Sequence, residues 1–120
     1  MQNLKNRIAC EKAIIKNLAK ICFDLDNSQG TVIYVRPNGD DDSIACTNPT
    51  QVYKAVNQCD ESFVIVKNIF TAKTLGVFMI VLGNDGFDCI ADQSVNDFTA
   101  KVDKHLDPII EKWENKILGL

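Results

Sequence analysis

Hydrophobic residues in the first part of the chain recur at the spacing of an α-helix. Within residues 3–22 one apolar stripe consists of Leu4, Ile8, Ile15, Leu18 and Cys22, with Ile14 and Ile21 beside it. Steps of three and four residues place such side chains on one helical face. The pattern therefore predicts an amphipathic first helix.

A second helical stripe lies near the end of the chain. It consists of Val95, Phe98, Val102, Leu106, Ile109, Trp113 and Ile117. Ser94 is suited to cap this helix, and Asp97 at its third position suits the helix dipole. Because Pro108 cannot donate a backbone hydrogen bond, we expect a kink or a break near residue 106.

Five segments between the helices are rich in β-branched and aromatic residues, which is typical of strands. They are residues 31–35, 43–46, 62–66, 77–82 and 87–91. Turn-forming residues at 36–42 and 83–86 predict hairpins, and residues 68–74 are expected to connect the third strand to the fourth. The fourth segment is continuously apolar, which predicts a central strand covered on both faces.

A short helix is predicted between the second and third strands. Asn48 is a good N-cap, Pro49 suits the first helical position, and Gln51 can reach back to complete a capping box. We expect the helix to run to about Cys59, with Val52, Ala55 and Val56 also facing inward.

The predicted element order is α-β-β-α-β-β-β-α over one domain, residues 1–120. A five-stranded, mostly antiparallel sheet with the helices packed on it would bury the apolar stripes, giving an α+β fold. In element order, from the first helix to the last, the chain resembles the roadblock, or dynein light chain, fold. That resemblance implies a homodimer joined through sheet edges and helices, acting as a scaffold without catalysis.

Two segments of the chain are similar to each other. Residues 30–56 and 76–102 align without gaps, and seven of the 27 positions are identical. Each segment is predicted to form a hairpin followed by a helix. An internal duplication explains the similarity, and so do the shared demands of turns and strands.

Charge is distributed unevenly along a chain whose formal net charge is −3. Residues 3–22 hold five basic residues and one acidic residue, whereas residues 23–97 hold four basic and eleven acidic ones. The overall acidity argues against nucleic acid as a partner. The longest apolar run, from Gly76 to Gly83, is too short for a membrane span, and the charged start is unlike a signal peptide. We expect a cytoplasmic protein.

The cysteines and the single histidine are arranged as expected for residues of a packed core, and less as expected for a catalytic or metal site. The five cysteines are Cys10, Cys22, Cys46, Cys59 and Cys89, and none are spaced as C-x-x-C. An odd number of scattered cysteines favours reduced thiols in a reducing compartment. A nucleophile paired with His105 and a zinc site are the chemical alternatives, and neither has the usual spacing. We therefore expect no catalytic residue, no metal and no cofactor.

Acidic residues cluster at the tips of the two predicted hairpins. They are Asp40, Asp41 and Asp42 on the first and Asp85 and Asp88 on the second. Such tips can bind a basic protein partner or a hard cation, or can be solvated turns that discourage aggregation.

The sequence thus favours a small non-enzymatic protein-interaction or scaffold domain that forms a homodimer. Ile109, Trp113 and Ile117 on the last helix are the expected dimer interface, because tryptophan is enriched at interfaces. One alternative is an acidic inhibitor or immunity-type protein whose hairpin tips block a basic site. A second is a small-molecule sensor with an apolar cavity under residues 63–66 and 77–82.

Overall fold

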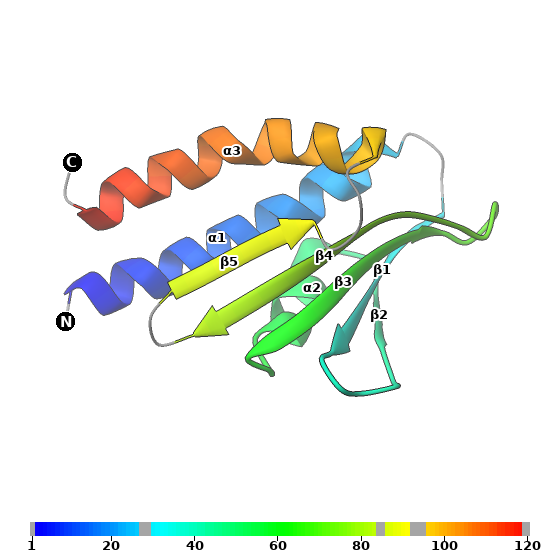
Figure 1. Cartoon of the computed structure of the whole chain (residues 1–120), viewed down its shortest axis with the longest axis horizontal. Coiled ribbons are helices and arrows are strands. Elements are labelled where there is room, and N and C mark those ends of the chain that lie inside the picture. Colours follow the sequence, from blue (N-terminus) through cyan, green and yellow to red (C-terminus); the bar gives the residue numbers. More distant parts are fainter. Residues whose placement is uncertain (1, 27–29, 84–85, 92–95, 119–120) are drawn as a thin grey trace.

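The chain folds into three helices and an antiparallel sheet, which confirms the predicted α+β class. A computed structural model describes residues 2–26, 30–83, 86–91 and 96–118 (Figure 1). For residues 2–8, 86–91, 114 and 116–118 it describes the backbone alone. The elements are α1 (Gln2–Leu25), β1 (Thr31–Pro37), β2 (Ile44–Cys46), α2 (Pro49–Val56), β3 (Glu61–Asn68), β4 (Lys73–Gly83), β5 (Gly86–Ala91) and α3 (Asp97–Leu118).

The strands lie in the order β2-β1-β3-β4-β5, and each neighbouring pair is antiparallel. β3 is therefore the middle strand, joined to β1 through Ile65 opposite Tyr34 and to β4 through Ile65 opposite Val77. The prediction that residues 77–82 form the central strand was wrong. An apolar run indicates burial, but it does not say which neighbours a strand has.

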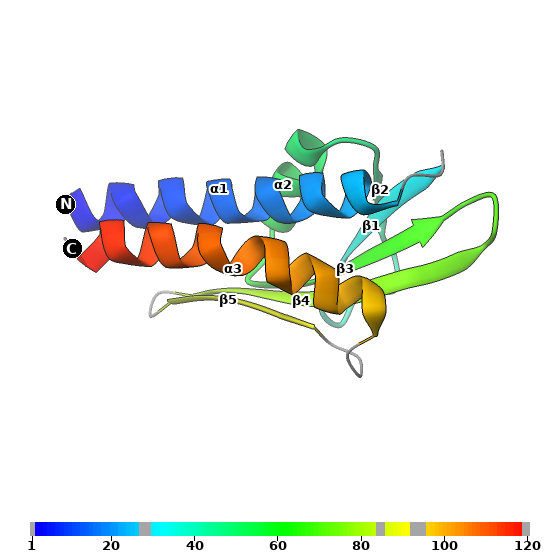
Figure 2. The same ribbon diagram turned by 90° about the horizontal axis from the view of Figure 1, so that it is seen from above.

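All three helices pack on the same face of the sheet (Figure 2). α1 and α3 lie side by side in opposite directions, and α2 packs on the other flank of α1. One continuous core joins Ile15 and Leu18 of α1 to Val56 of α2 and to Val64 and Phe78 of the sheet. The chain therefore covers one face of β4, not the two that its apolar run predicted.

Local capping explains where α2 begins. Asn48 accepts a hydrogen bond from the Gln51 backbone N–H (3.0 Å), and Pro49 occupies the first helical position, as predicted. The Gln51 side chain also reaches back, but to the backbone N–H of Thr47 (2.8 Å) instead of that of Asn48. α2 is shorter than expected, and Cys59 lies beyond its end.

α3 begins later than predicted, because Asn96 is its cap. Asn96 Oδ1 accepts from the Thr99 backbone N–H (2.8 Å), and Thr99 Oγ1 accepts from the Asn96 N–H (3.0 Å). This reciprocal pair replaces the predicted cap at Ser94, which lies outside the described residues. The helix continues through Pro108 without a break and bends along its length (Figure 2).

Residues 69–72 connect β3 to β4 in a protruding hairpin (Figure 1), within the residues 68–74 predicted to connect these strands. Buried Asn68 organises it: its Oδ1 accepts from the N–H groups of Phe70 (3.0 Å) and Thr71 (3.1 Å). Its Nδ2 donates to Asp26 Oδ2 (3.0 Å), which also accepts from Thr31 Oγ1 (2.6 Å). These bonds tie the hairpin to the end of α1.

The two similar segments form hairpins whose registers differ by two residues. In the second hairpin Gly83 pairs with Gly86. In the first, the corresponding Asp40 N–H donates to the Pro37 carbonyl (3.1 Å), but pairing resumes only at Val35 opposite Ile44. The first hairpin thus has a tight turn at the same position as the second, but its acidic residues after the turn stay outside the strand pairing.

Ser62 provides a test of the core. This residue is 1% exposed, and its hydroxyl has no hydrogen-bond partner. Since a buried unsatisfied hydroxyl costs about 1 kcal/mol or more, Ser62→Ala should stabilise the fold by ~1 kcal/mol, or roughly 4 °C in melting temperature. Thermal unfolding followed by circular dichroism measures this effect. A lower melting temperature would show that the hydroxyl contributes favourably.

Candidate interaction surface

The strands bury alternate side chains under the helices and present the others on the opposite side of the sheet. In β3, Ser62, Val64 and Val66 are buried, whereas Phe63 and Ile65 are only half-buried. We call the surface without helices the open face. It comprises Val32, Tyr34 and Arg36 from β1, Glu61, Phe63, Ile65 and Lys67 from β3, and Val77, Met79 and Val81 from β4.

The open face is apolar at its centre. An antiparallel sheet with one solvated face normally alternates apolar and polar residues. Here Phe63, Ile65, Met79 and Val81 occupy positions where such alternation would place polar side chains. They adjoin one another in register, Phe63 opposite Met79 and Glu61 opposite Val81. The centre of the face therefore has the composition of a buried surface.

Two cations lie over aromatic rings of the open face. Lys67 Nζ is 5.7 Å from the centroid of the Tyr34 ring, and Arg36 Cζ is 4.9 Å from that of Phe63. A cation above an aromatic face is attracted by the ring quadrupole. Arg36 also donates from Nη1 to the Asp40 carbonyl (3.1 Å), which links the face to the acidic loop.

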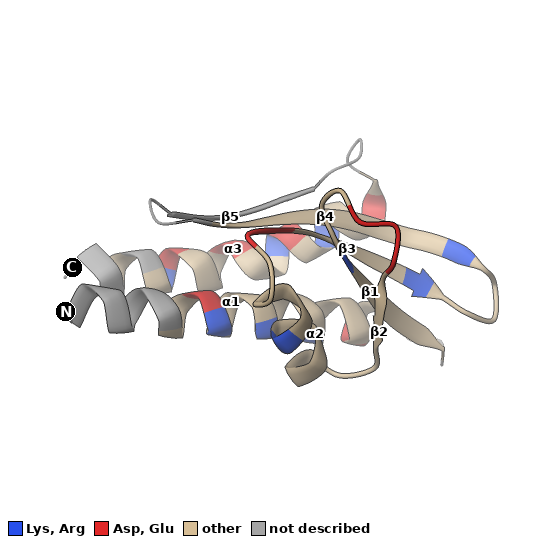
Figure 3. Ribbon diagram, turned by 90° about the horizontal axis from the view of Figure 1, so that it is seen from below, with Lys and Arg blue, Asp and Glu red and all other residues tan. Residues whose placement is uncertain are grey.

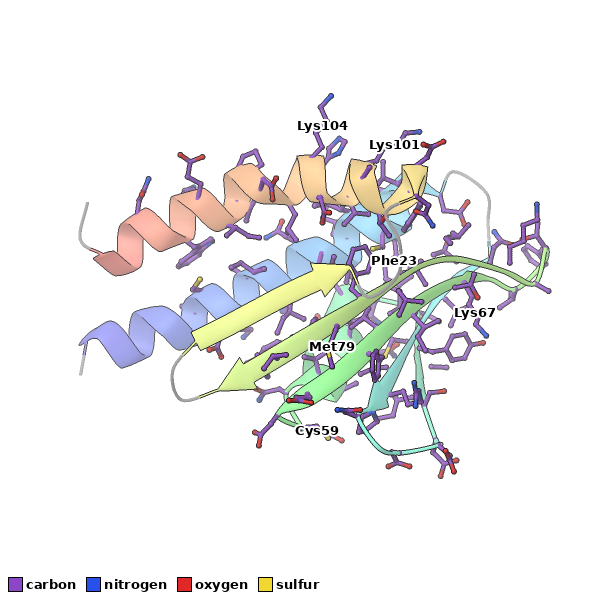
Figure 4. All side chains as sticks on the ribbon, viewed as in Figure 1. Phe23, Cys59, Lys67, Met79, Lys101 and Lys104 are labelled. Atoms are coloured by element: carbon purple, nitrogen blue, oxygen red, sulfur yellow. The ribbon has the colours of Figure 1, made fainter. Side chains whose placement is uncertain are left out.

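Charges of opposite sign mark the two ends of β3. Glu61 begins the strand, and its Oε2 accepts from Asn38 Nδ2 (2.7 Å). Lys67 lies at the other end, near the protruding hairpin, while Cys59 marks the Glu61 end (Figure 4). Along the open face β3 thus reads Glu61, Phe63, Ile65, Lys67: acidic, apolar, apolar, basic.

The predicted acidic residues are only partly brought together. Asp40, Asp41 and Asp42 are exposed in the β1–β2 loop, drawn in red in Figure 3, which follows the Pro37–Ser62 pair at the Glu61 end of β3. Asp85 lies outside the described residues, and of Asp88 only the pairing of its backbone with Val81 is described. Among the described residues, no group of three or more His, Cys, Asp or Glu side chains could hold a metal ion.

The predicted dimer residues of α3 lie in different settings. Trp113 packs against the core of its own chain, as does Ile110, and Ile109 is half-buried. The side chain of Ile117 lies outside the described residues. Trp113 thus has a structural role within the chain, and an interface on α3 stays a prediction.

The cysteines that the structure describes contribute mainly to the core. Cys10, Cys22 and Cys46 are buried, and Cys59 is half-buried. Burial raises the pKa of the Cys46 thiol, which makes it a poorer nucleophile. His105 Nδ1 lies 2.7 Å from the Lys101 carbonyl of its own helix. Lys104, the residue before His105, lies on the opposite side of the molecule from Cys59 (Figure 4), so Cys59 and His105 form no pair.

Two depressions adjoin the turn between α2 and β3. The larger, about 510 Å³, is lined by Glu11, Asn57, Gln58, Cys59, Asp60, Glu61, Val81 and Leu82. The smaller, about 350 Å³, shares Cys59, Asp60 and Glu61 with it. Both are largely polar and lie at the surface, unlike the apolar cavity that a sensor under residues 63–66 and 77–82 predicts.

No family model, curated protein or solved structure matches this chain. Within the described part of the chain, no helix combines the length and the apolar character that crossing a membrane requires.

Sequence reasoning did not find the open face. The signal was present, because residues 31–35, 63–66 and 77–82 are each almost continuously apolar. Such runs are typical of strands buried on both faces, and the strand at residues 77–82 was expected to be covered on both. The surface became visible only when all three helices were found on one side.

Thiol reactivity provides a test of the cysteine environments. We expect a maleimide reagent at pH 8 to modify Cys59 first and Cys46 ~10-fold or more slowly, because burial and a raised pKa both limit thiolate attack. Peptide mass spectrometry over time measures the rates. Equal rates in the folded protein would contradict the burial of Cys46.

Proposed function

We propose that this chain is a small non-enzymatic protein-interaction domain that binds another polypeptide through its open face. The observation that carries the proposal is the apolar centre of that face, formed by half-buried Phe63, Ile65, Met79 and Val81. A contiguous apolar patch that solvent partly reaches commonly marks an interaction site.

The size of the open face supports a protein partner. The three strands that form the open face, β1, β3 and β4, are spaced ~4.8 Å apart and about eight residues long at ~3.3 Å each, which gives a plate of roughly 14 by 26 Å. Its flat area is therefore about 370 Å², comparable in extent to the ~300–600 Å² of the largest apolar patches on monomeric proteins, which are often interaction sites.

The chemistry of the face also favours protein over other partners. Aromatic residues and arginine are enriched at protein interfaces, and Tyr34, Phe63 and Arg36 are all present. The net charge of −3 disfavours nucleic acid and anionic membranes. The buried thiols of Cys10, Cys22 and Cys46 suit the reducing conditions of the cytoplasm, where we propose that the domain acts, without a cofactor or metal.

The acidic loop supports a second candidate function, that of an inhibitor or immunity-type protein. Asp40, Asp41 and Asp42 are exposed and could enter a basic site on a partner. If residues 30–56 and 76–102 arose by duplication, Asp85 and Asp88 would form the equivalent second tip. This candidate differs from the first because it needs no burial of the open face.

Reversing the charge of the loop separates the two candidates. The triple variant D40K/D41K/D42K should fold normally, because these side chains are exposed, and should keep any complex formed through apolar contacts. Circular dichroism shows whether the variant is folded. Size-exclusion chromatography of an extract of the producing cells shows whether the complex with the partner is kept. Loss of the complex with an intact fold would favour the inhibitor.

The open face itself is tested by one matched pair of variants. Ile65→Lys places a charge at its centre, whereas Ile44→Lys introduces the same change at a more exposed residue on the other side of the sheet. In size-exclusion chromatography of fresh extract, the wild-type chain and the Ile44→Lys variant should elute at apparent masses above the 13.4 kDa of a monomer. The Ile65→Lys variant should elute at the mass of a monomer. A wild-type chain that elutes as a monomer in extract would overturn the proposal.

A further inference from the structure

We infer that the polypeptide covering the open face is a second copy of this chain, stacked face to face with its strands antiparallel to those of the first. This inference rests on the proposed function and identifies its partner. The observation that supports this inference is the order of four outward side chains along β3, the middle strand of the sheet: Glu61, Phe63, Ile65 and Lys67.

The strip formed by these four side chains is complementary to itself. A two-fold axis crossing β3 between Phe63 and Ile65 places Glu61 of one copy over Lys67 of the partner subunit. The same axis places Phe63 over Ile65 of the partner subunit. A surface that complements itself under a two-fold rotation is the condition for a closed symmetric dimer.

Charge selects this orientation over the other two-fold arrangement. If the axis ran parallel to the strands, Lys67 would face Lys67 of the partner subunit and Glu61 would face the partner's Glu61. Like charges facing across an interface are strongly unfavourable.

The arrangement also gives Arg36 a suitable environment. Arg36 pairs across the sheet with Phe63, and Tyr34 lies two residues away on β1. The antiparallel stack brings Arg36 of one copy toward the ring of the partner's Tyr34. A guanidinium stacks well on an aromatic face and is less strongly hydrated than an ammonium group, so arginine suits an interface.

The resulting assembly has two sheets enclosed by two layers of helices. Sheets that pack face to face lie ~10 Å apart with their strands rotated by about 30°. The apolar runs of β1, β3 and β4 are then buried on both sides, as their sequences indicated. The arrangement differs from a dimer joined through sheet edges or through α3.

A charge swap in the purified full-length chain tests this geometry. Glu61→Lys and Lys67→Glu should each raise the dimer dissociation constant about tenfold or more, since each creates like-charge pairs. The double variant E61K/K67E should return it to near the wild-type value. Glu111→Lys and Lys54→Glu, at exposed helical positions, are the matched controls and should leave it unchanged.

Sedimentation equilibrium measures these constants, and circular dichroism shows that each variant is folded. Recovery in the double variant supports the antiparallel stack. A double variant as weak as the singles, or weaker, overturns it. A purified wild-type chain that is monomeric overturns the second-copy inference alone, because an assembly in extract that depends on Ile65 would still support the proposed function.

Cross-linking of the wild-type protein gives an independent readout. Within one chain Glu61 and Lys67 lie six residues apart on a strand, about 20 Å, which is too far for a zero-length carbodiimide link. An amide between Glu61 and Lys67 can therefore form only between copies. We expect the linked peptide in the dimer band by mass spectrometry. A dimer band that carries other links and lacks this one would contradict the arrangement.

Discussion

A five-stranded sheet with apolar residues on both sides needs cover on both sides, and this chain supplies helices for one. The packing of α1, α2 and α3 on a single face buries Val64 and Phe78 in one continuous core. The open face exists because all three helices pack on the other face of the sheet. The same strands that stabilise the fold through one set of side chains display the alternate set, so the proposed interaction surface lies on the sheet itself.

β3 connects the two sides of the sheet. Its inward residues join the core, and its outward residues form a line from Glu61 to Lys67. The strand is also anchored at its far end, where Asn68 bonds to Asp26 and to the hairpin backbone. Because β3 pairs along its length with both β1 and β4, the backbone that carries its outward side chains is held in place. A surface held in this way loses little conformational entropy when it is buried.

Local physical rules predicted much of the fold. Helical periodicity located the helices, and the cap of α2 at Asn48 was recognised because few residue types can fill that position. The start of α3 was missed because Ser94 and Asn96 are both good caps and only tertiary contacts choose between them. Strand order and the side on which helices pack are non-local, so β3 was not recognised as the middle strand. The open face was missed for the same reason, whereas the exposed Asp40, Asp41 and Asp42 were recognisable from composition alone.

In the proposed dimer the open face would link the stability of the fold to the amount of protein present. When two copies bury a surface between them, association stabilises the folded chain, and each tenfold dilution removes up to about 1.4 kcal/mol per mole of dimer. The copy number of the chain in a cell would then regulate how much of it persists. A scarce chain would be degraded preferentially, and an abundant one would be protected by its own concentration.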